Sequence, residues 1–325
     1  MTLTAGNNFG DGPRAATGSG LERSGSGNLD WQPRTGLAWG GSRCWILGII
    51  NATPDSFSDG GAVQSPAIAV VVARAMVQAG ADGVDIGGES TRPGALPVNA
   101  AEQIRRVVPL IAAIRQALPE LVISIDTTRA VVAAEAIRAG ADVINDVSGG
   151  GDDPEMLPLA ADRRAGLILM HRLRTPRQDV ASTEYAAASP PPVSGDVVMQ
   201  VRAALAEMLA RATAAGVAPQ RILLDPGLGF GKTVRQNAEL IERTAELLTL
   251  GRPVLSGLSR KSFVGAMSGL PAGSDPKDRL AGTVALSVLH AVRGASVFRV
   301  HDVGPCREAL NVLDNVALAA GASII

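Results

Sequence analysis

The feature that most constrains this 325-residue chain is a unit that recurs from Trp45 onward: a short apolar run, a polar loop, an Ala-rich stretch and a glycine. The apolar runs are continuous rather than alternating, which is typical of strands buried on both faces of a parallel sheet. Aromatic residues are only 3% of the chain, so Ala, Val, Ile and Leu must build the core. The eight runs are residues 45–50, 83–87, 121–127, 142–147, 166–171, 222–226, 253–259 and 297–302.

The Ala-rich stretches between the runs have helical spacing, most clearly at 66–79, 129–139 and 196–215. Four of the units stop at a glycine that precedes a small apolar residue, which predicts left-handed helix ends. These glycines are Gly80, Gly140, Gly216 and Gly294. Eight strand–helix units, over a length close to the roughly 250 residues typical of such barrels, predict a (β/α)8 TIM barrel. An open, doubly wound sheet of eight strands is the alternative topology.

Residues 1–40 differ from the rest, because they are Gly/Ser-rich at 17–20 and 24–28 and lack a hydrophobic period. This composition predicts a disordered, flexible N-terminal extension. A single barrel domain is expected over 41–325.

Charge and cysteine content narrow the classes of function. The chain has 30 Lys and Arg against 31 Asp and Glu, with no blocks of like charge. We therefore expect no nucleic acid and no membrane as partner. The only cysteines, Cys44 and Cys306, form no C-x-x-C motif. Together with the lack of an apolar segment in residues 1–20, they indicate a cytoplasmic protein without a structural zinc site.

Polar residues stand at the C-terminal end of every predicted strand, on the face where barrel enzymes build their active sites. In chain order they are Asn51, Glu89 to Arg92, Asp126, Asn145 with Asp146, His171, Asp225, Ser259 to Ser262, and Arg299 with His301. One such residue is explained as a satisfied core polar group. Eight strand ends that converge on one rim are better explained by a ligand, because buried polar groups without partners are costly.

The residue types indicate the ligand's chemistry. Hydrogen-bond acceptors that suit a flat heterocycle with adjacent N–H donors are Asp126, Asn145 and Asp225. Positive charge after the seventh and eighth strands, the usual phosphate corner of a barrel, comes from Arg260, Lys261, Arg299 and His301. Ser262 opens the next helix, where an anion is favoured.

Two other patterns are set aside. The run at 227–233 resembles a phosphate-binding P-loop, but it has three residues where the motif needs four, and Pro226 replaces the first glycine. The three histidines have no metal-ligand spacing. We expect His290 to be packed or at the surface, and His171 to be either structural or pocket-lining.

Two loops on the catalytic face, 51–65 and 87–98, are long and polar. Their composition fits plain connections, but Pro54, Phe57 and Arg92 favour mobile lids over the site.

Seven motifs together carry a resemblance to a known family. They are NATPDSFSDGG (51–61), GGESTRPG (87–94), SIDT (124–127), NDVSGG (145–150), DPGLGFGK (225–232), SRKSF (259–263) and RVHD (299–302). From Trp45 to the C-terminus the chain resembles the dihydropteroate synthases, the folate-pathway enzymes that sulfonamides inhibit.

The resemblance implies a reaction in which 6-hydroxymethyl-7,8-dihydropterin diphosphate and p-aminobenzoate give dihydropteroate and pyrophosphate. It also implies a Mg²⁺ ion beside Asn51 and a homodimer. The pterin would be held by Asp126, Asn145, Asp225 and Lys261, and the diphosphate by Asn51, Arg299 and His301. The closed site and the p-aminobenzoate carboxylate would involve Thr91, Arg92 and Ser262, and Phe230 is included among the substrate-binding residues. The catalytic residues are expected to be Asp126, Lys261, Arg299 and His301.

The chain departs from the family pattern at 172–176 and in a Pro-rich insertion at 186–194. Alternatives are a pterin-binding methyltransferase barrel, which needs no diphosphate corner, and a non-catalytic pterin-binding paralogue. A sulfonamide-insensitive enzyme is a further alternative.

Overall fold

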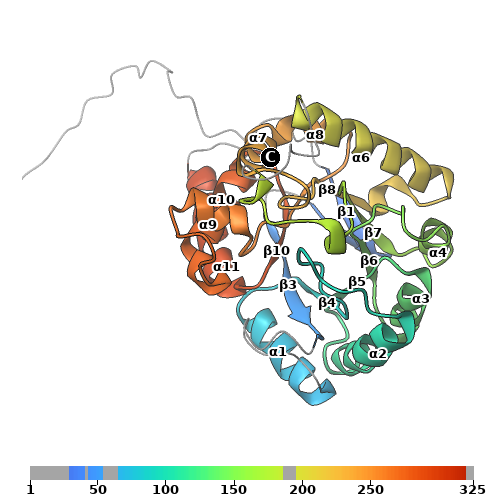
Figure 1. Cartoon of the computed structure of the whole chain (residues 1–325). Helices are drawn as coiled ribbons and strands as arrows, with labels where there is room; N and C mark the ends of the chain where they lie inside the picture. The colour runs from blue at the N-terminus through green and yellow to red at the C-terminus, as the bar shows by residue number, and fades with distance from the viewer. Residues whose placement is uncertain (1–28, 41–42, 54–64, 186–194, 320–325) are drawn as a thin grey trace, which may run out of the picture.

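A computed structural model describes residues 29–40, 43–53, 65–185 and 195–319. Eight parallel strands stand around a common axis, with helices outside them (Figure 1). The strands are β3 (Trp45–Asn51), β4 (Gly83–Gly87), β5 (Val122–Asp126), β6 (Val143–Asp146), β7 (Gly166–Met170), β8 (Ile222–Asp225), β9 (Leu255–Ser256) and β10 (Val297–Val300). Their order is β8-β7-β6-β5-β4-β3-β10-β9, and a parallel bridge between Leu224 and Val254 joins the two ends. The predicted (β/α)8 barrel is confirmed.

The helices form an outer ring that covers the strands (Figure 1). They are α1 (Pro66–Gln78), α2 (Ala100–Ala117), α3 (Ala130–Ala139), α4 (Met156–Asp162), α6 (Val197–Ala214), α7 (Val234–Glu242), α8 (Thr244–Leu248), α9 (Ser262–Met267), α10 (Leu280–Val292) and α11 (Val303–Ala319). Short 3-10 turns lie at η2 (Pro176–Gln178), η3 (Pro219–Arg221) and η4 (Pro276–Arg279). The largest hydrophobic cluster lies between the strands and this ring, and consists mainly of Ala, Val, Ile and Leu. None of the helices in the described ranges is long and apolar enough to cross a membrane.

The predicted helix stops are confirmed. Gly80, Gly140, Gly216 and Gly294 all have positive φ, between 95° and 115°. At each of them the chain leaves a helix and turns towards the next strand, which is why a residue with no Cβ penalty is used.

The N-terminal segment contains a β-hairpin that the sequence analysis did not expect. Strands β1 (Trp31–Arg34) and β2 (Leu37–Trp39) pair antiparallel around a turn with Gly36 at φ 78°. The prediction of a flexible segment up to residue 40 is therefore wrong for residues 31–39, because Trp31 and Trp39 are buried. Residues 1–28 lie outside the described part of the chain, as does the insertion at 186–194.

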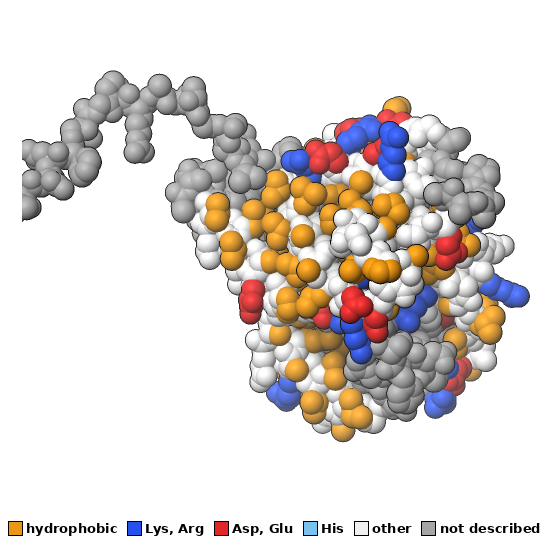
Figure 2. Space-filling view, turned by 60° about the vertical axis from the view of Figure 1, so that its left-hand side comes forward, with side chains coloured by type: hydrophobic (Ala, Val, Ile, Leu, Met, Phe, Trp, Pro, Cys, Tyr) orange, Lys and Arg blue, Asp and Glu red, His pale blue; other side chains and the backbone are white. Residues whose placement is uncertain are grey.

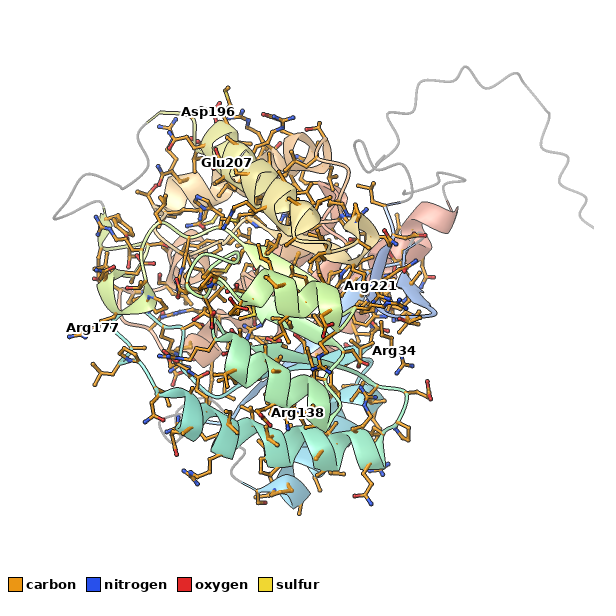
Figure 3. All side chains as sticks on the ribbon, turned by 90° about the vertical axis from the view of Figure 1, so that its right-hand side faces the viewer. Arg34, Arg138, Arg177, Asp196, Glu207 and Arg221 are labelled. Carbon is orange, nitrogen blue, oxygen red and sulfur yellow. The ribbon has the colours of Figure 1, made fainter. Side chains whose placement is uncertain are left out.

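The hairpin closes the N-terminal end of the barrel. Trp31 and Trp39 pack in one cluster with residues of the strands, including Leu47 and Val122. The Trp31 ring meets Trp39 edge-on, at 5.3 Å between centroids, and its Nε1 donates to the Arg221 carbonyl at 2.8 Å. In the side view of Figure 3, Arg34 of β1 and Arg221 lie at one end of the molecule and Arg177 of η2 lies at the other. The predicted site residues lie at the C-terminal ends of the strands, so the hairpin and the predicted site occupy opposite ends of the barrel.

Candidate active site at the barrel mouth

The barrel interior holds an arginine between two carboxylates. Arg299 of β10 donates from Nε to Asp85 Oδ2 at 2.5 Å and from Nη2 to Asp126 Oδ2 at 2.8 Å. Asn145 donates from Nδ2 to the same oxygen of Asp85, at 3.1 Å. All three acidic or amide side chains are buried. Residues from β4, β5, β6 and β10 therefore form one connected network.

The close charges in this network shift the pKa values of Asp126 and Arg299. Burial raises the pKa of Asp126; Arg299 opposes this, and the negative charge of Asp85 adds to it. Although burial disfavours its charged form, the two carboxylates raise the pKa of Arg299 further above its usual value. The network thus keeps Arg299 charged and offers carboxylate and amide acceptors to a ligand with N–H donors.

Lys261 extends into the mouth on the opposite side of this network. Its Nζ donates to the Leu228 carbonyl and lies 4.2 Å from the centre of the Phe230 ring. Burial lowers the pKa of Lys261 to about 8, while Asp225 acts in the opposite direction. Burial also raises the pKa of Asp225, whose Oδ1 accepts the Gly227 N–H at 2.7 Å. Lys261, Asp225 and Phe230 are thus brought together as predicted.

The glycine-rich loop after β8 leaves room for the side chain of Lys261. Gly229 has φ 82°, and a Cβ at this position would lie 2.6 Å from Cδ of Lys261. Lys232 is fully buried and donates to the carbonyls of Gly227 and Phe230, both at 2.9 Å. The lysine therefore binds its own loop, which agrees with the rejection of a P-loop.

His171 is structural. It is buried beside Lys232, whose Nζ lies 3.1 Å from its Nδ1. Burial and the lysine's charge lower the pKa of His171 to about 3. His290 is packed, since it is buried behind the barrel wall with Nδ1 2.9 Å from Ser256 Oγ.

The surroundings of His301 disfavour the positive charge that the sequence predicts for it. Burial, followed by the nearby charges of Arg299 and Arg260, lowers the pKa of His301 to about 3. The Ser259 hydroxyl accepts the backbone N–H of His301 at 3.2 Å and lies 3.0 Å from Nδ1. Either atom can be the donor in the second contact, because the hydroxyl has one hydrogen and a second lone pair. His301 is therefore a neutral ring at a corner rich in arginine.

The backbone is strained at this corner. Arg260 has φ 59°, the left-handed region that non-glycine residues rarely adopt. Its N–H donates to Thr283 Oγ1 and its carbonyl accepts from Arg279, which fixes the turn. Its guanidinium forms a two-bonded pair with Asp302, at 2.8 and 2.6 Å. Asp302 therefore largely compensates the charge of Arg260. Arg260 contributes less positive charge to this corner than the sequence predicts.

The second predicted loop reaches this corner. Partial burial and the charge of Arg260 lower the pKa of Arg92. The Gly94 N–H donates at 2.8 Å to the carbonyl of Pro176, in the segment 171–185 that crosses the front of the barrel in Figure 1. Thr91 lies in the same loop. Most of the first predicted loop, residues 54–64, lies outside the described residues.

Ser262 is the first residue of α9, and its Oγ accepts the N–H of Ser182 at 3.2 Å. The same segment is held by Asp179, which is buried and accepts from Tyr185 Oη and, at 2.9 Å, from the Gly231 N–H. Segment 171–185 thus packs between Ser262 and the glycine-rich loop.

Asn51 ends β3 and is partly buried. In the part of the chain that the structure describes, no three His, Cys, Asp or Glu side chains gather to hold a metal ion. Mg²⁺ commonly binds one or two protein oxygens and otherwise phosphate oxygens and water. A single amide oxygen at a strand end fits a magnesium ion that arrives with a phosphate group.

Comparisons with known proteins identify the family of this chain. A family model described as pterin binding enzyme matches residues 47–301. The chain belongs to the pterin-binding enzyme family. It is 44% identical to the dihydropteroate synthase of Synechocystis sp. over 274 residues, which is 84% of this chain and 90% of the relative.

Two solved structures of Xanthomonas albilineans dihydropteroate synthase also resemble this member of the pterin-binding family. The one with 4-aminobenzoic acid has a TM-score of 0.77 and 39% identity, and covers 89% of this chain and 98% of its own. The one with 7,8-dihydropteroate has a TM-score of 0.74 and 36% identity, with the same two coverages. The family predicted from the motifs is confirmed.

Proposed function

We propose that this pterin-binding family member is a dihydropteroate synthase of folate biosynthesis. It would condense 6-hydroxymethyl-7,8-dihydropterin diphosphate with p-aminobenzoate to give 7,8-dihydropteroate and pyrophosphate. The observation that carries this proposal is the division of the barrel mouth into an acceptor-rich interior and an arginine-rich rim. A pterin diphosphate has N–H donors at one end and anionic oxygens at the other, so it matches both. The names of the relatives support the same reaction.

The pterin would lie in the interior. Its N–H groups would donate to Asp126, Asn145 and Asp225, and carboxylate acceptors make these bonds stronger than neutral ones. Lys261, whose Nζ lies 4.2 Å from the centre of the Phe230 ring, would donate to a ring acceptor of the pterin.

The diphosphate would lie at the rim, next to His301 and Arg92. Arg299 of the interior network would also bind it, since 19% of its side chain is exposed. Arg299 would contribute positive charge, and His301 a hydrogen bond from its ring. Pyrophosphate leaves from the CH2 group as its C–O bond breaks, and the electron-rich pterin delocalises the resulting cation. The aromatic amine of p-aminobenzoate then attacks this carbon and loses a proton to solvent. The protein needs no nucleophile, so stabilisation of the leaving group and orientation of the substrates account for catalysis.

Mg²⁺, held by Asn51, would neutralise charge on the diphosphate when bound. The p-aminobenzoate carboxylate would meet Ser262, and Thr91 would help to close the site over both substrates.

Release of pyrophosphate by the purified protein tests the proposal. The dihydropterin diphosphate is supplied with and without p-aminobenzoate, and with Mg²⁺ or EDTA. We expect metal-dependent release and a pteroate product only when p-aminobenzoate is present. Binding of the pterin without release would instead indicate a methyltransferase or a non-catalytic paralogue.

We also propose that the enzyme is a homodimer. Apolar side chains spread over the face formed by α9, α10 and α11 (Figure 2), where Met267, Leu289, Val312 and Val316 are exposed. A groove of about 400 Å³ adjoins this face between α7 and α10, and Leu286 and Leu289 line it. A second copy would cover this apolar area. Light scattering should report a dimer, and Leu289→Lys should shift it to monomer; a monomeric wild type would contradict the proposal.

We expect a cytoplasmic enzyme, because both cysteines, Cys44 and Cys306, are buried free thiols, which suits a reducing compartment.

A further inference from the structure

One buried glutamine connects both ends of the loop that carries Thr91 and Arg92. Gln103 lies in the first turns of α2, and its side chain is only 2% exposed. Its Nε2 donates to the carbonyl of Val98 at 3.0 Å and to the carboxylate of Glu89. Glu89 opens the loop and Val98 closes it. A single amide nitrogen thus fixes the start and the end of the same segment.

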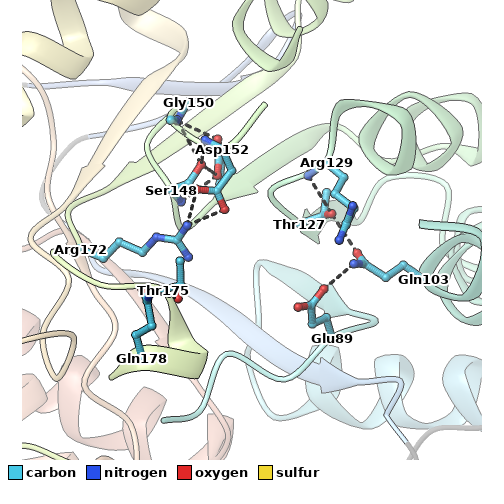
Figure 4. Close-up of polar contacts among 12 residues, drawn as sticks. Glu89, Gln103, Thr127, Arg129, Ser148, Gly150, Asp152, Arg172, Thr175 and Gln178 are labelled. Atoms are coloured by element: carbon cyan, nitrogen blue, oxygen red, sulfur yellow. Dashed lines mark hydrogen bonds and ion pairs between the residues drawn. The ribbon is translucent and has the colours of Figure 1, made fainter. Parts of the chain in front are cut away.

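The other half of the amide faces the pterin-binding strands. Oε1 of Gln103 accepts from Thr127 Oγ1 at 3.0 Å (Figure 4). Thr127 directly follows Asp126, and its N–H donates to the Asn145 carbonyl at 3.1 Å. The two acceptors of Nε2 and the donor to Oε1 leave only one orientation of the amide. Gln103 therefore stands between the loop and the ends of β5 and β6.

The acceptor on the loop is a carboxylate in a partly dry place. Burial raises the pKa of Glu89, while the positive charges of Arg129 and Arg172 act against this and Asp152 adds to it. Arg129 lies at the same rim, where its N–H donates to Thr127 Oγ1 at 3.3 Å (Figure 4). A hydrogen bond to a carboxylate in such surroundings is stronger than a neutral one. This bond therefore holds the start of the loop to α2.

We propose that Gln103 is a positioning residue for the second substrate: it holds the loop with Thr91 and Arg92 against the pterin-binding strand ends, so that p-aminobenzoate meets a completed site. Gln103 touches no substrate itself. This inference rests on the proposed dihydropteroate synthase reaction. The proposal predicts that pterin binding and the use of p-aminobenzoate respond differently to a change at Gln103. The pterin contacts on β5 and β6 remain when the loop is no longer bonded to Gln103.

Gln103→Leu tests the inference, since leucine fills most of the space without hydrogen bonding. Binding of the pterin substrate alone, measured by calorimetry, should change less than about twofold. The kcat/KM for p-aminobenzoate should fall at least tenfold. Gln116→Leu, on the exposed side of the same helix, is the matched control and should change neither quantity.

Gln103→Glu provides a readout that a purely structural role would not produce. The introduced carboxyl group and Glu89 can hold one shared proton at low pH and so keep the bond, but two ionised carboxylates repel each other. The charges that face the pair are Arg129, Arg172 and Asp152. The kcat/KM for p-aminobenzoate should therefore fall as the pH rises, along a limb that wild type lacks.

The outcomes separate the two proposals. A wild-type enzyme that forms no dihydropteroate overturns both. If wild type is active and Gln103→Leu leaves both quantities unchanged, or lowers both by the same factor, the positioning role is wrong. A Gln103→Glu enzyme with the wild-type pH profile also contradicts it.

Discussion

At the scale of single residues, Asp85 is the centre of the interior network. It is fully buried, and one of its oxygens accepts from both Arg299 and Asn145. Its other oxygen, Oδ1, has no hydrogen-bond partner among the described residues. Such an oxygen is costly to bury, so the stability gained from Arg299 must offset this penalty.

Asp85→Ala should therefore be severe. It would leave Arg299 with Asp126 alone, and loss of one partner from a buried ion pair costs about 3–5 kcal/mol. We expect this loss in the free energy of unfolding measured with urea, together with a fall in kcat/KM of at least a hundredfold.

Ser124→Ala is the matched control for Asp85→Ala. Ser124 is the register partner of Asp85 on β5, and it is equally buried. Its Oγ lacks a partner within the described ranges. The free energy of unfolding should stay unchanged or rise by about 1 kcal/mol. A large loss of stability in Ser124→Ala would show that any change in this layer is harmful.

The pH profile of kcat/KM should report Lys261. Burial lowers its pKa to about 8, so the free enzyme loses this positive charge as the pH rises through that value. The kcat/KM for the pterin diphosphate should then fall about tenfold per unit well above pH 8. Lys261→Arg, whose guanidinium stays charged, should remove this limb even if its overall activity is lower. An unchanged limb in Lys261→Arg would assign the titration to another group.

Polar residues at the predicted strand ends identify most of the candidate site. They predict the charges of those residues less well. This pattern finds Asp126, Asn145 and Asp225, because polar residues at strand ends are conspicuous. It misses Asp85, which lies inside a strand, where sequence does not tell which residues face the axis. It misjudges the charge of His301, because the pKa of that ring depends on burial and on arginines distant in sequence.

At the scale of elements, the conformation of the loop after β8 makes room for the side chain of Lys261, which is distant in sequence. Gly227, Gly229 and Gly231 all have positive φ, and Lys232 anchors the carbonyls between them. The loop lies against Lys261, which belongs to the following strand–helix unit.

Gly229→Ala should impair catalysis through Lys261. The new Cβ would both strain the backbone and displace the lysine stem, which it would approach to 2.6 Å. Gly251→Ala is the control, because Gly251 has a similar φ of 72° with open space around it. Each variant should lose about 1 kcal/mol of stability. Only Gly229→Ala should lose tenfold or more in kcat/KM for the pterin diphosphate; equal losses of activity would contradict the steric argument.

The sequence predicts elements well where the signals are local. Helix stops at glycine and continuous apolar runs depend on a few neighbouring residues, so the predicted bounds of β3 and α1 agree with the structure to within one residue. β9 is expected over 253–259, but its pairing is limited to Leu255–Ser256 and the bridge at Val254. Its length is set by its neighbours in the barrel, which is information that the local run lacks.

At the scale of the whole molecule, the hairpin joins the N-terminal segment to the barrel. Its two tryptophans share a hydrophobic cluster with residues of the strands. Trp31→Ala should cost about 3–5 kcal/mol in the free energy of unfolding, because Trp31 is fully buried among those strands. The kcat at room temperature should be unchanged, because the candidate active site lies at the C-terminal ends of the strands. A parallel loss of kcat in folded protein would show that the two ends are coupled.

The hairpin has a signal in the sequence, although a weak one. Trp31 and Trp39 flank a Thr35-Gly36 pair, which is a common turn signal between two strands. The Gly/Ser-rich composition of the preceding residues hides it. What the two tryptophans would pack against is decided only when the barrel has closed.

Trp31 and Trp39 pack over one end of the barrel, among residues of the strands. We therefore expect a molecule that binds beside Asp85, Asp126 and Asn145 to enter from the end where the strands finish. The loops at that end would then influence both its binding and its release.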